Sequence, residues 1–265
     1  MKVFTTMDEL IDPFESPKLL IEGAIEEIED LRVKCAHFVE NCRTIPLEKR
    51  DHETGENVIK FRVTDKIPPR LRYTTSNILN NLRHSLDQAI NSGAVELGAK
   101  KRDSYFPFAK DEDDISAALK SRCKSVDSRL SDYIVSEFNP YGGGDEFLYA
   151  VSKVSGPNKH QLTLGLESNL PALVIGDGFG VELTGPGRLG YLAWDSRKQE
   201  LEFARLGPQA VLKLNGDPRL PIFIAISRSA ELGGDAAANV LLNVASKVGD
   251  IVEAIERETA RLKRL

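Results

Sequence analysis

Apolar residues recur at seven-residue intervals near both ends of the chain, and this pattern constrains the fold more than any other feature. Between residues 17 and 43 two sets of positions repeat in this way (Ile21, Ile28, Cys35 and Cys42; Ala24, Leu31 and Phe38). The segment after Asp235 repeats similarly (Leu241, Val244, Val248, Ile251, Ile255 and Leu262). Because such a repeat is typical of long helices packed lengthwise, both ends of the chain are predicted to join one helical bundle.

Local signals place the remaining helices. Ser16 before Pro17 predicts an N-cap and a helix that runs to about Arg43. A second long helix is predicted from about Leu71 to Ser92, with one buried stripe (Leu71, Ile78, Leu79, Leu82, Leu86, Ala89 and Ile90). Shorter helical patterns cover about 113–123, 128–138 and 145–155.

Two regions are predicted to form β-structure. Alternating segments on either side of H-E-T-G-E at 52–56 predict a hairpin, and from about residue 167 short β-type runs alternate with Gly, Pro or Asn-Gly turns. The predicted fold class is α+β: a bundle of long heptad-patterned helices with an N-terminal β-hairpin insertion and a C-terminal antiparallel sheet closed by a last long helix. We expect a single domain over 1–265, with a helical part at about 1–166 and 235–265 and a β-rich part at about 167–234.

Composition excludes some function classes. The 265 residues include 35 Lys and Arg against 40 Asp and Glu, so a nucleic acid is expected to bind only through a local basic site. No apolar run is long enough to span a bilayer, and the start has no continuous apolar segment of a secretory signal, so no membrane partner is expected. Three cysteines without a paired spacing favour free thiols and a cytoplasmic protein, with no metal and no cofactor.

Three motifs are better explained without a ligand. Gly185 to Gly190 matches G-x-G-x-x-G, but a β-like run follows it where a dinucleotide site needs a helix. The acidic run at 111–114 lacks the spacing of a calcium loop and is read as helix capping. Arg32 and His37 have the R-x4-H spacing of HEPN-type ribonucleases, yet five residues of helix place them on separated faces, which favours two exposed polar residues.

Polar residues beside the buried stripe of the second helix form the strongest candidate site. Ser76, Asn80, Arg83 and Asp87 fall within about 60° of one another at 100° per residue. Arg83 could hold a phosphate or carboxylate while Asp87 fixes its guanidinium and Asn80 donates a further bond. The alternative interpretation is a surface salt bridge.

Short sequence motifs along most of the chain resemble those of a protein family. N-L-R-H-S-L-D at 81–87, F-P-F at 106–108, N-P-Y at 139–141 and N-K-H at 158–160 resemble N-L-R-x-x-L-D, F-P, P-Y and D-K-H in a family of uncharacterised bacterial proteins. Asn158 departs from the aspartate of that pattern. The resemblance implies the same order of helix, hairpin, helices, β-region and last helix. It also directs attention to Lys159 and His160 as further members of the site.

Two functions follow from these residues. The first is a binding or interaction protein of unknown ligand and partner, with Asn80 and Lys159 as ligand-binding residues. The second is a HEPN-like metal-independent ribonuclease or phosphate-handling enzyme, in which Arg83 binds phosphate, Asp87 orients it and His160 acts as general acid or base. The alternative role for His160 is capping a helix or bonding a backbone carbonyl. The seven-residue repeat would also serve a homodimer or intramolecular packing equally well.

Overall fold

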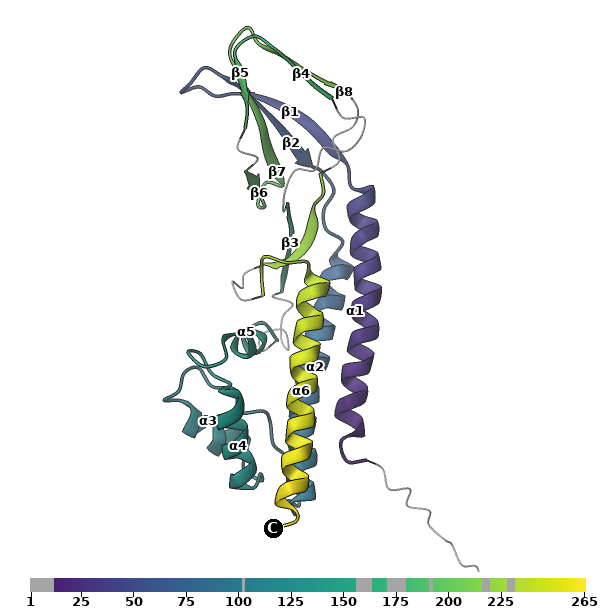
Figure 1. Ribbon diagram of the computed structural model, residues 1–265, viewed down its shortest axis with the longest axis vertical. Helices are drawn as coiled ribbons and strands as arrows, with labels where there is room; N and C mark the ends of the chain where they lie inside the picture. Colours follow the sequence, from purple (N-terminus) through teal and green to yellow (C-terminus); the bar gives the residue numbers. More distant parts are fainter. Residues whose placement is uncertain are drawn as a thin grey trace, which may run out of the picture.

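Three long helices run side by side through most of the molecule (Figure 1). The computed structural model describes residues 12–101, 103–155, 164–170, 180–190, 193–215, 220–227 and 232–265. The long helices are α1 (Glu15–Asn41), α2 (Pro69–Glu96) and α6 (Ala237–Leu262). Bonds from Ser85 and Ser92 on α2 to the carbonyls of Pro17 and Pro13 show that α1 runs antiparallel to α2.

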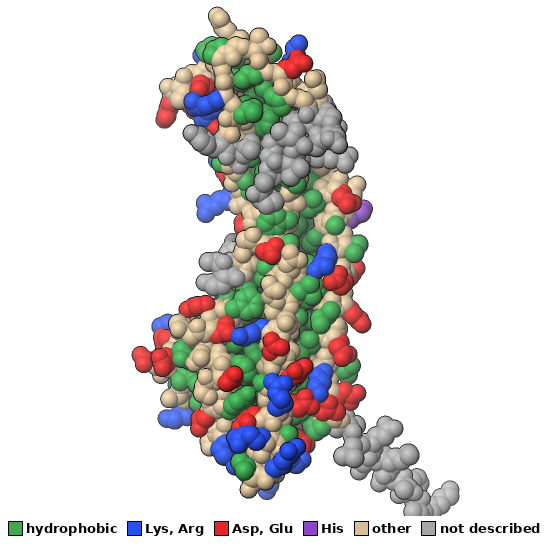
Figure 2. Space-filling model, viewed as in Figure 1, with side chains coloured by type: hydrophobic (Ala, Val, Ile, Leu, Met, Phe, Trp, Pro, Cys, Tyr) green, Lys and Arg blue, Asp and Glu red, His purple; other side chains and the backbone are tan. Residues whose placement is uncertain are grey.

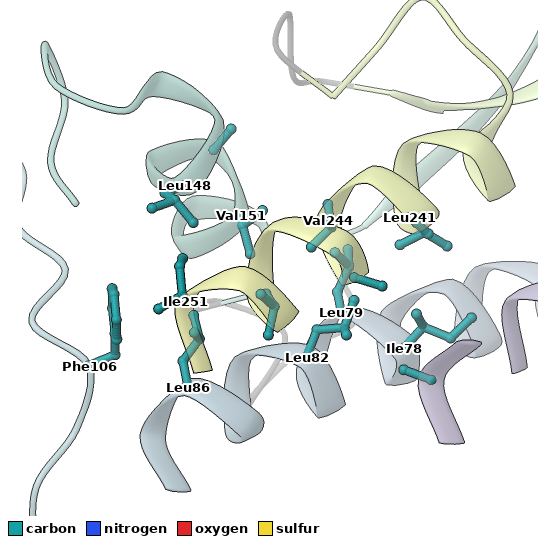
Figure 3. Packing of buried hydrophobic residues seen from close by; sticks show 14 of the residues in the cluster. Ile78, Leu79, Leu82, Leu86, Phe106, Leu148, Val151, Leu241, Val244 and Ile251 are labelled. Atoms are coloured by element: carbon teal, nitrogen blue, oxygen red, sulfur yellow. The ribbon is translucent and has the colours of Figure 1, made fainter. Parts of the chain in front are cut away.

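The predicted stripes of α2 and α6 are buried. All seven stripe residues of α2 and the six repeat positions of α6 lie in one hydrophobic core. Figure 3 shows side chains of α2, α6 and α5 meeting there (Ile78, Leu79, Leu82, Leu86, Leu241, Val244, Ile251, Leu148 and Val151), with Phe106 at one edge. In α1 only Ala24, Ile28 and Leu31 of the repeat are fully buried, because this helix lies on the outside of α2 and α6.

The start of α1 differs from the prediction. The helix begins at Glu15 after Phe14, and no side chain caps it. The Ser16 hydroxyl instead donates to Gln88 Oε1 on α2 at 2.7 Å, because residue 16 already lies inside the first turn. The predicted cap is therefore a contact between helices.

Three short helices lie along one side of the lower half of the long helices (Figure 1). They are α3 (Ile115–Arg122), α4 (Ser128–Phe138) and α5 (Glu146–Ser155), close to the predicted ranges. Asp127 caps α4 by accepting from the amide of Arg129, and Asn139 ends it in the left-handed conformation. A segment at 104–109 contacts both α2 and α3, because the amide of Phe106 donates to Asp87 and the amide of Tyr105 donates to the Arg122 carbonyl, and Phe106 and Phe108 are buried.

The strands form an antiparallel sheet above the helices together with two separate strand pairs (Figure 1). The sheet has the order β1 (Thr44–Arg50), β2 (Asn57–Val63), β7 (Glu200–Leu206) and β5 (Gly187–Leu189), and β6 (Trp194–Asp195) also pairs with β7. The separate pairs are β3 (Gly165–Asn169) with β9 (Phe223–Ser227), and β4 (Gly180–Thr184) with β8 (Val211–Asn215). The molecule is thus α+β, as predicted.

The arrangement of the sheet differs from the prediction. The N-terminal hairpin is not a separate insertion, because β2 pairs with β7 and becomes an inner strand of the sheet. Phe61 and Phe203 on these two strands pack with ring centroids 5.0 Å apart in a second apolar core. Burial of both aromatic rings favours this pairing over a sheet made from the C-terminal strands alone.

No helix in the described part of the chain has both the length and the apolar content needed to cross a membrane.

Candidate functional site

Two of the candidate residues of α2, Arg83 and Asp87, contact α5 and the 104–109 segment. Ser76, Arg83 and Asp87 are buried, the last two with only 6% and 8% of their surface exposed, and Asn80 is half-buried. This burial does not fit the alternative of a surface salt bridge. It follows from packing, because α5 and residues 104–109 cover the side of α2 that continues the apolar stripe.

Arg83 holds the end of helix α5. Its Nη1 donates to the carbonyl of Ser152 at 3.2 Å and to Ser155 Oγ at 3.1 Å, and Ser155 Oγ in turn donates to the Val151 carbonyl. The last carbonyls of a helix have no partner within the helix and lie at the negative end of its dipole. The cation therefore stabilises the C-terminal turn of α5.

An aromatic ring supports the same guanidinium. The Cζ of Arg83 lies 5.2 Å from the centroid of the Phe108 ring. A cation over the face of a ring is attracted by the ring quadrupole, and more strongly when both are desolvated. Phe108 and the two hydrogen bonds to α5 together fix the plane of the guanidinium.

Asp87 holds the neighbouring segment rather than Arg83 alone. Its Oδ1 accepts from the amide of Phe106 at 2.8 Å. One turn further along α2, Asn91 accepts from the amide of Ser104 and donates to the Ser104 carbonyl. Asn91 was not among the residues predicted for the site, although its spacing of four residues from Asp87 places both on one side of the helix.

Burial dominates the electrostatics of the site. It lowers the pKa of Arg83, an effect that the negative charge of Asp87 opposes and the positive charge of Arg122 reinforces. The group still stays protonated in a protein. Its Nε is buried and has no hydrogen-bond partner within the described residues. No described residue therefore supplies an acceptor to this N–H.

The other predicted members of the site lie elsewhere or outside the description. Lys159 and His160 fall outside the described residues, so their roles stay predictions. Arg32 and His37 are both exposed on α1. No group of three or more His, Cys, Asp or Glu side chains in the described part of the chain could hold a metal ion.

The glycine motif at 185–190 contains the short strand β5. Gly185 has a φ of 91°, and β5 begins two residues later at Gly187. In the part of the chain that the structure describes, the next element after this motif is the strand β6 and not a helix that could receive a pyrophosphate.

Comparison of the chain with protein-family models, with curated proteins and with solved structures found no match.

Proposed function

We propose that the protein is a binding protein whose ligand carries a phosphate or carboxylate group, and that Arg83 receives this group. The observation that carries the proposal is the buried Nε of Arg83, which has no acceptor among the described residues. Buried polar groups in proteins are nearly always hydrogen-bonded, so a buried N–H without a partner calls for an explanation. A ligand oxygen at this position would supply the missing acceptor.

The surroundings of Arg83 favour an anion over a neutral acceptor. Its two hydrogen-bonded partners, the Ser152 carbonyl and the Ser155 hydroxyl, carry no charge. A buried cation gains most from an anionic partner, because a charge-assisted bond is roughly twice as strong as a neutral one. The negative charge of Asp87 opposes an anion at Arg83, and the smaller effect of the positive charge of Arg122 favours one.

The site is also preorganised. Phe108 and helix α5 already fix the guanidinium, so a ligand need not order a long flexible side chain on binding. Asn80, one turn before Arg83 and half-buried, is proposed as a second donor to the ligand, and Lys159 as a further cation.

The enzyme alternative uses the same arginine. A HEPN-like metal-independent ribonuclease or phosphate-handling enzyme would bind phosphate at Arg83, orient it through Asp87 and transfer protons through His160. A ribonuclease assay separates the two functions. The binding proposal predicts no turnover of RNA, whereas turnover that is lost in both Arg83→Gln and His160→Ala would establish the enzyme.

The finer features of the chain are proposed together with this function. We propose that the long helices form a heptad-patterned bundle within a single domain, and that the protein is bacterial and cytoplasmic. A homodimer through the outer face of the helices is the proposed alternative to a monomer.

The test of binding is an NMR titration of wild-type protein with inorganic phosphate. The Nε–H signal of Arg83 is expected to shift and saturate as phosphate is added. The signal is assigned to Arg83 by its loss in Arg83→Lys. If the lysine variant does not fold, the signal is assigned instead by its change in Ser155→Ala, which removes a hydrogen-bond partner of the same guanidinium. A variant of the exposed Arg32, Arg32→Lys, serves as the matched control and should leave the titration unchanged.

Two results would overturn the proposal. One is an Nε–H signal that stays in place while phosphate and then acetate are raised to high concentration. The other is a shift that rises linearly without saturation and occurs equally at exposed arginines, which indicates only the general effect of salt.

A further inference from the structure

One end of the molecule carries a surface of exposed cations, although the whole chain has a net charge of −5. We call it the basal surface and define it by six residues: Lys101, Lys124, Arg129, Arg261, Lys263 and Arg264. Figure 2 shows Lys and Arg side chains gathered at the lower end of the molecule, around the end of α6. We propose that the basal surface binds the phosphate backbone of a single-stranded nucleic acid, independently of the site at Arg83.

Contacts between elements bring these residues together. The ion pair of Lys263 with Glu96, at 2.5 Å, joins the end of α6 to the end of α2, five residues before Lys101. Ser125 donates to Asp103, which places Lys124 beside the segment that follows Lys101. Arg129 and Arg261 lie close enough for their charges to repel, as the effect of Arg261 on the pKa of Arg129 shows.

Three carboxylates of this end lie beneath the cations with which they pair, whereas Asp103 and Asp132 are exposed. In the pair of Arg261 with Glu258 the side-chain exposures are 61% and 10%. They are 58% and 27% for Lys263 with Glu96, and 53% and 23% for Arg129 with Asp127. At these three ion pairs a ligand that approaches from solvent meets the cation before the carboxylate, so each pair still presents positive charge outward.

The other three cations add to this potential. Lys101, Lys124 and Arg264 are exposed, and within the described ranges they take part in no ion pair. Neighbouring cations at the C-terminal ends of α2 and α6 also complement the helix dipoles, but a dipole effect reaches only the last turn. It accounts for Lys263 and for Lys124, which directly follows the C-cap of α3, but not for Arg129, which lies in the first turn of α4.

A single strand fits this surface better than a duplex. Tyr105 is about half exposed and lies beside the same region, since its amide donates to the Arg122 carbonyl, two residues before Lys124. Cations combined with an exposed aromatic ring, on which a base can stack, are typical of surfaces that bind single strands. The ends of helices at this surface offer no protruding helix or ribbon to enter a groove.

The test uses fluorescence anisotropy with labelled polyuridine and the full chain. The triple variant Lys101→Gln, Lys124→Gln, Arg129→Gln removes three cations and leaves Arg261, whose loss would expose the buried Glu258. If each cation meets one phosphate, the salt slope of log K falls by about 2, which corresponds to about 50-fold weaker binding at ~0.15 M salt.

A matched control removes three exposed cations elsewhere. Arg32→Gln, Lys34→Gln, Lys198→Gln changes the net charge equally, but each of these cations pairs with an exposed carboxylate. This control is expected to bind polyuridine within about twofold of the wild type. Because Arg83 is intact in both triple variants, the result does not depend on the site at Arg83.

Other results would overturn the inference. Equal losses in the two triple variants would show attraction by overall charge only. Tighter binding to a duplex of the same length, or to phosphatidylserine vesicles, would assign the basal surface to another partner. If the wild type does not bind polyuridine at physiological salt, the proposal that the basal surface binds a single strand is wrong.

Discussion

Two helical glycines provide a direct test of how closely α2 and α6 pack. A Cβ added at Gly93 on α2 would lie 2.8 Å from Thr259 Oγ1 and 2.9 Å from Leu130 Cδ2. Thr259 cannot easily turn away, because its hydroxyl donates to the Ile255 carbonyl at 2.7 Å and the residue is buried. A Cβ added at Gly249 on α6 meets nothing within 4 Å.

The magnitudes follow from two opposing effects. Replacing Gly with Ala inside a helix stabilises by about 0.5–1 kcal/mol, because the unfolded chain loses conformational freedom. Overpacking a core costs about 1–3 kcal/mol. Gly249→Ala should therefore raise the free energy of unfolding by about 0.5–1 kcal/mol, and Gly93→Ala should lower it by about 1 kcal/mol.

Urea denaturation followed by circular dichroism measures both variants against the wild type. The difference between them, about 2 kcal/mol, isolates the packing cost, since the helix effect is common to both. Equal denaturant slopes for the three proteins ensure that the midpoints report stability. If Gly93→Ala proves as stabilising as Gly249→Ala, the close approach of the helices at Gly93 is wrong.

Two further predictions concern titrating groups. Arg205, by hydrogen bonding to Asp51, lowers the pKa of that carboxyl from 3.8 to about 2, so its contribution to stability is complete above pH 3.8 and is lost as the pH falls toward 2. Urea midpoints between pH 4 and pH 2 should depend less steeply on pH in Asp51→Asn, and an unchanged dependence would contradict the pairing. Burial raises the pKa of Cys35 to about 11 and of Cys123 to about 12, so both should resist iodoacetamide at pH 8 until urea unfolds the protein. Rapid alkylation of Cys123 in the native protein, measured by mass spectrometry, would show that this thiol is accessible.

The helices could be predicted from the sequence because their signals are local. The periodic burial of α2 and α6 depends on residues three, four and seven positions apart, and the structure buries every residue of those two stripes. The partners of strands are not local. The alternation in β2 and β7 indicates a strand and its apolar face, but nothing in either segment identifies the other as its neighbour.

The candidate site was predictable only in part for the same reason. Helical geometry places Arg83 and Asp87 on one side of α2, and the structure agrees. Their burial depends on α5 and on residues 104–109, which no periodic pattern assigns to this face of the helix. Asn91 was missed because its importance comes from the Ser104 backbone, thirteen residues away, and not from its own neighbours in the helix.

The pairing of β2 with β7 has a consequence for how the chain reaches its native state. Phe61 lies opposite Leu201, so 140 residues must be synthesised after the first partner before the second exists. Until then the hairpin of β1 and β2 exposes Ile59, Phe61 and Val63 together with an unpaired strand edge. Contacts so distant in sequence close slowly, and such surfaces favour aggregation. The period between synthesis of the hairpin and arrival of β7 is therefore when the nascent chain exposes the surface most prone to aggregation.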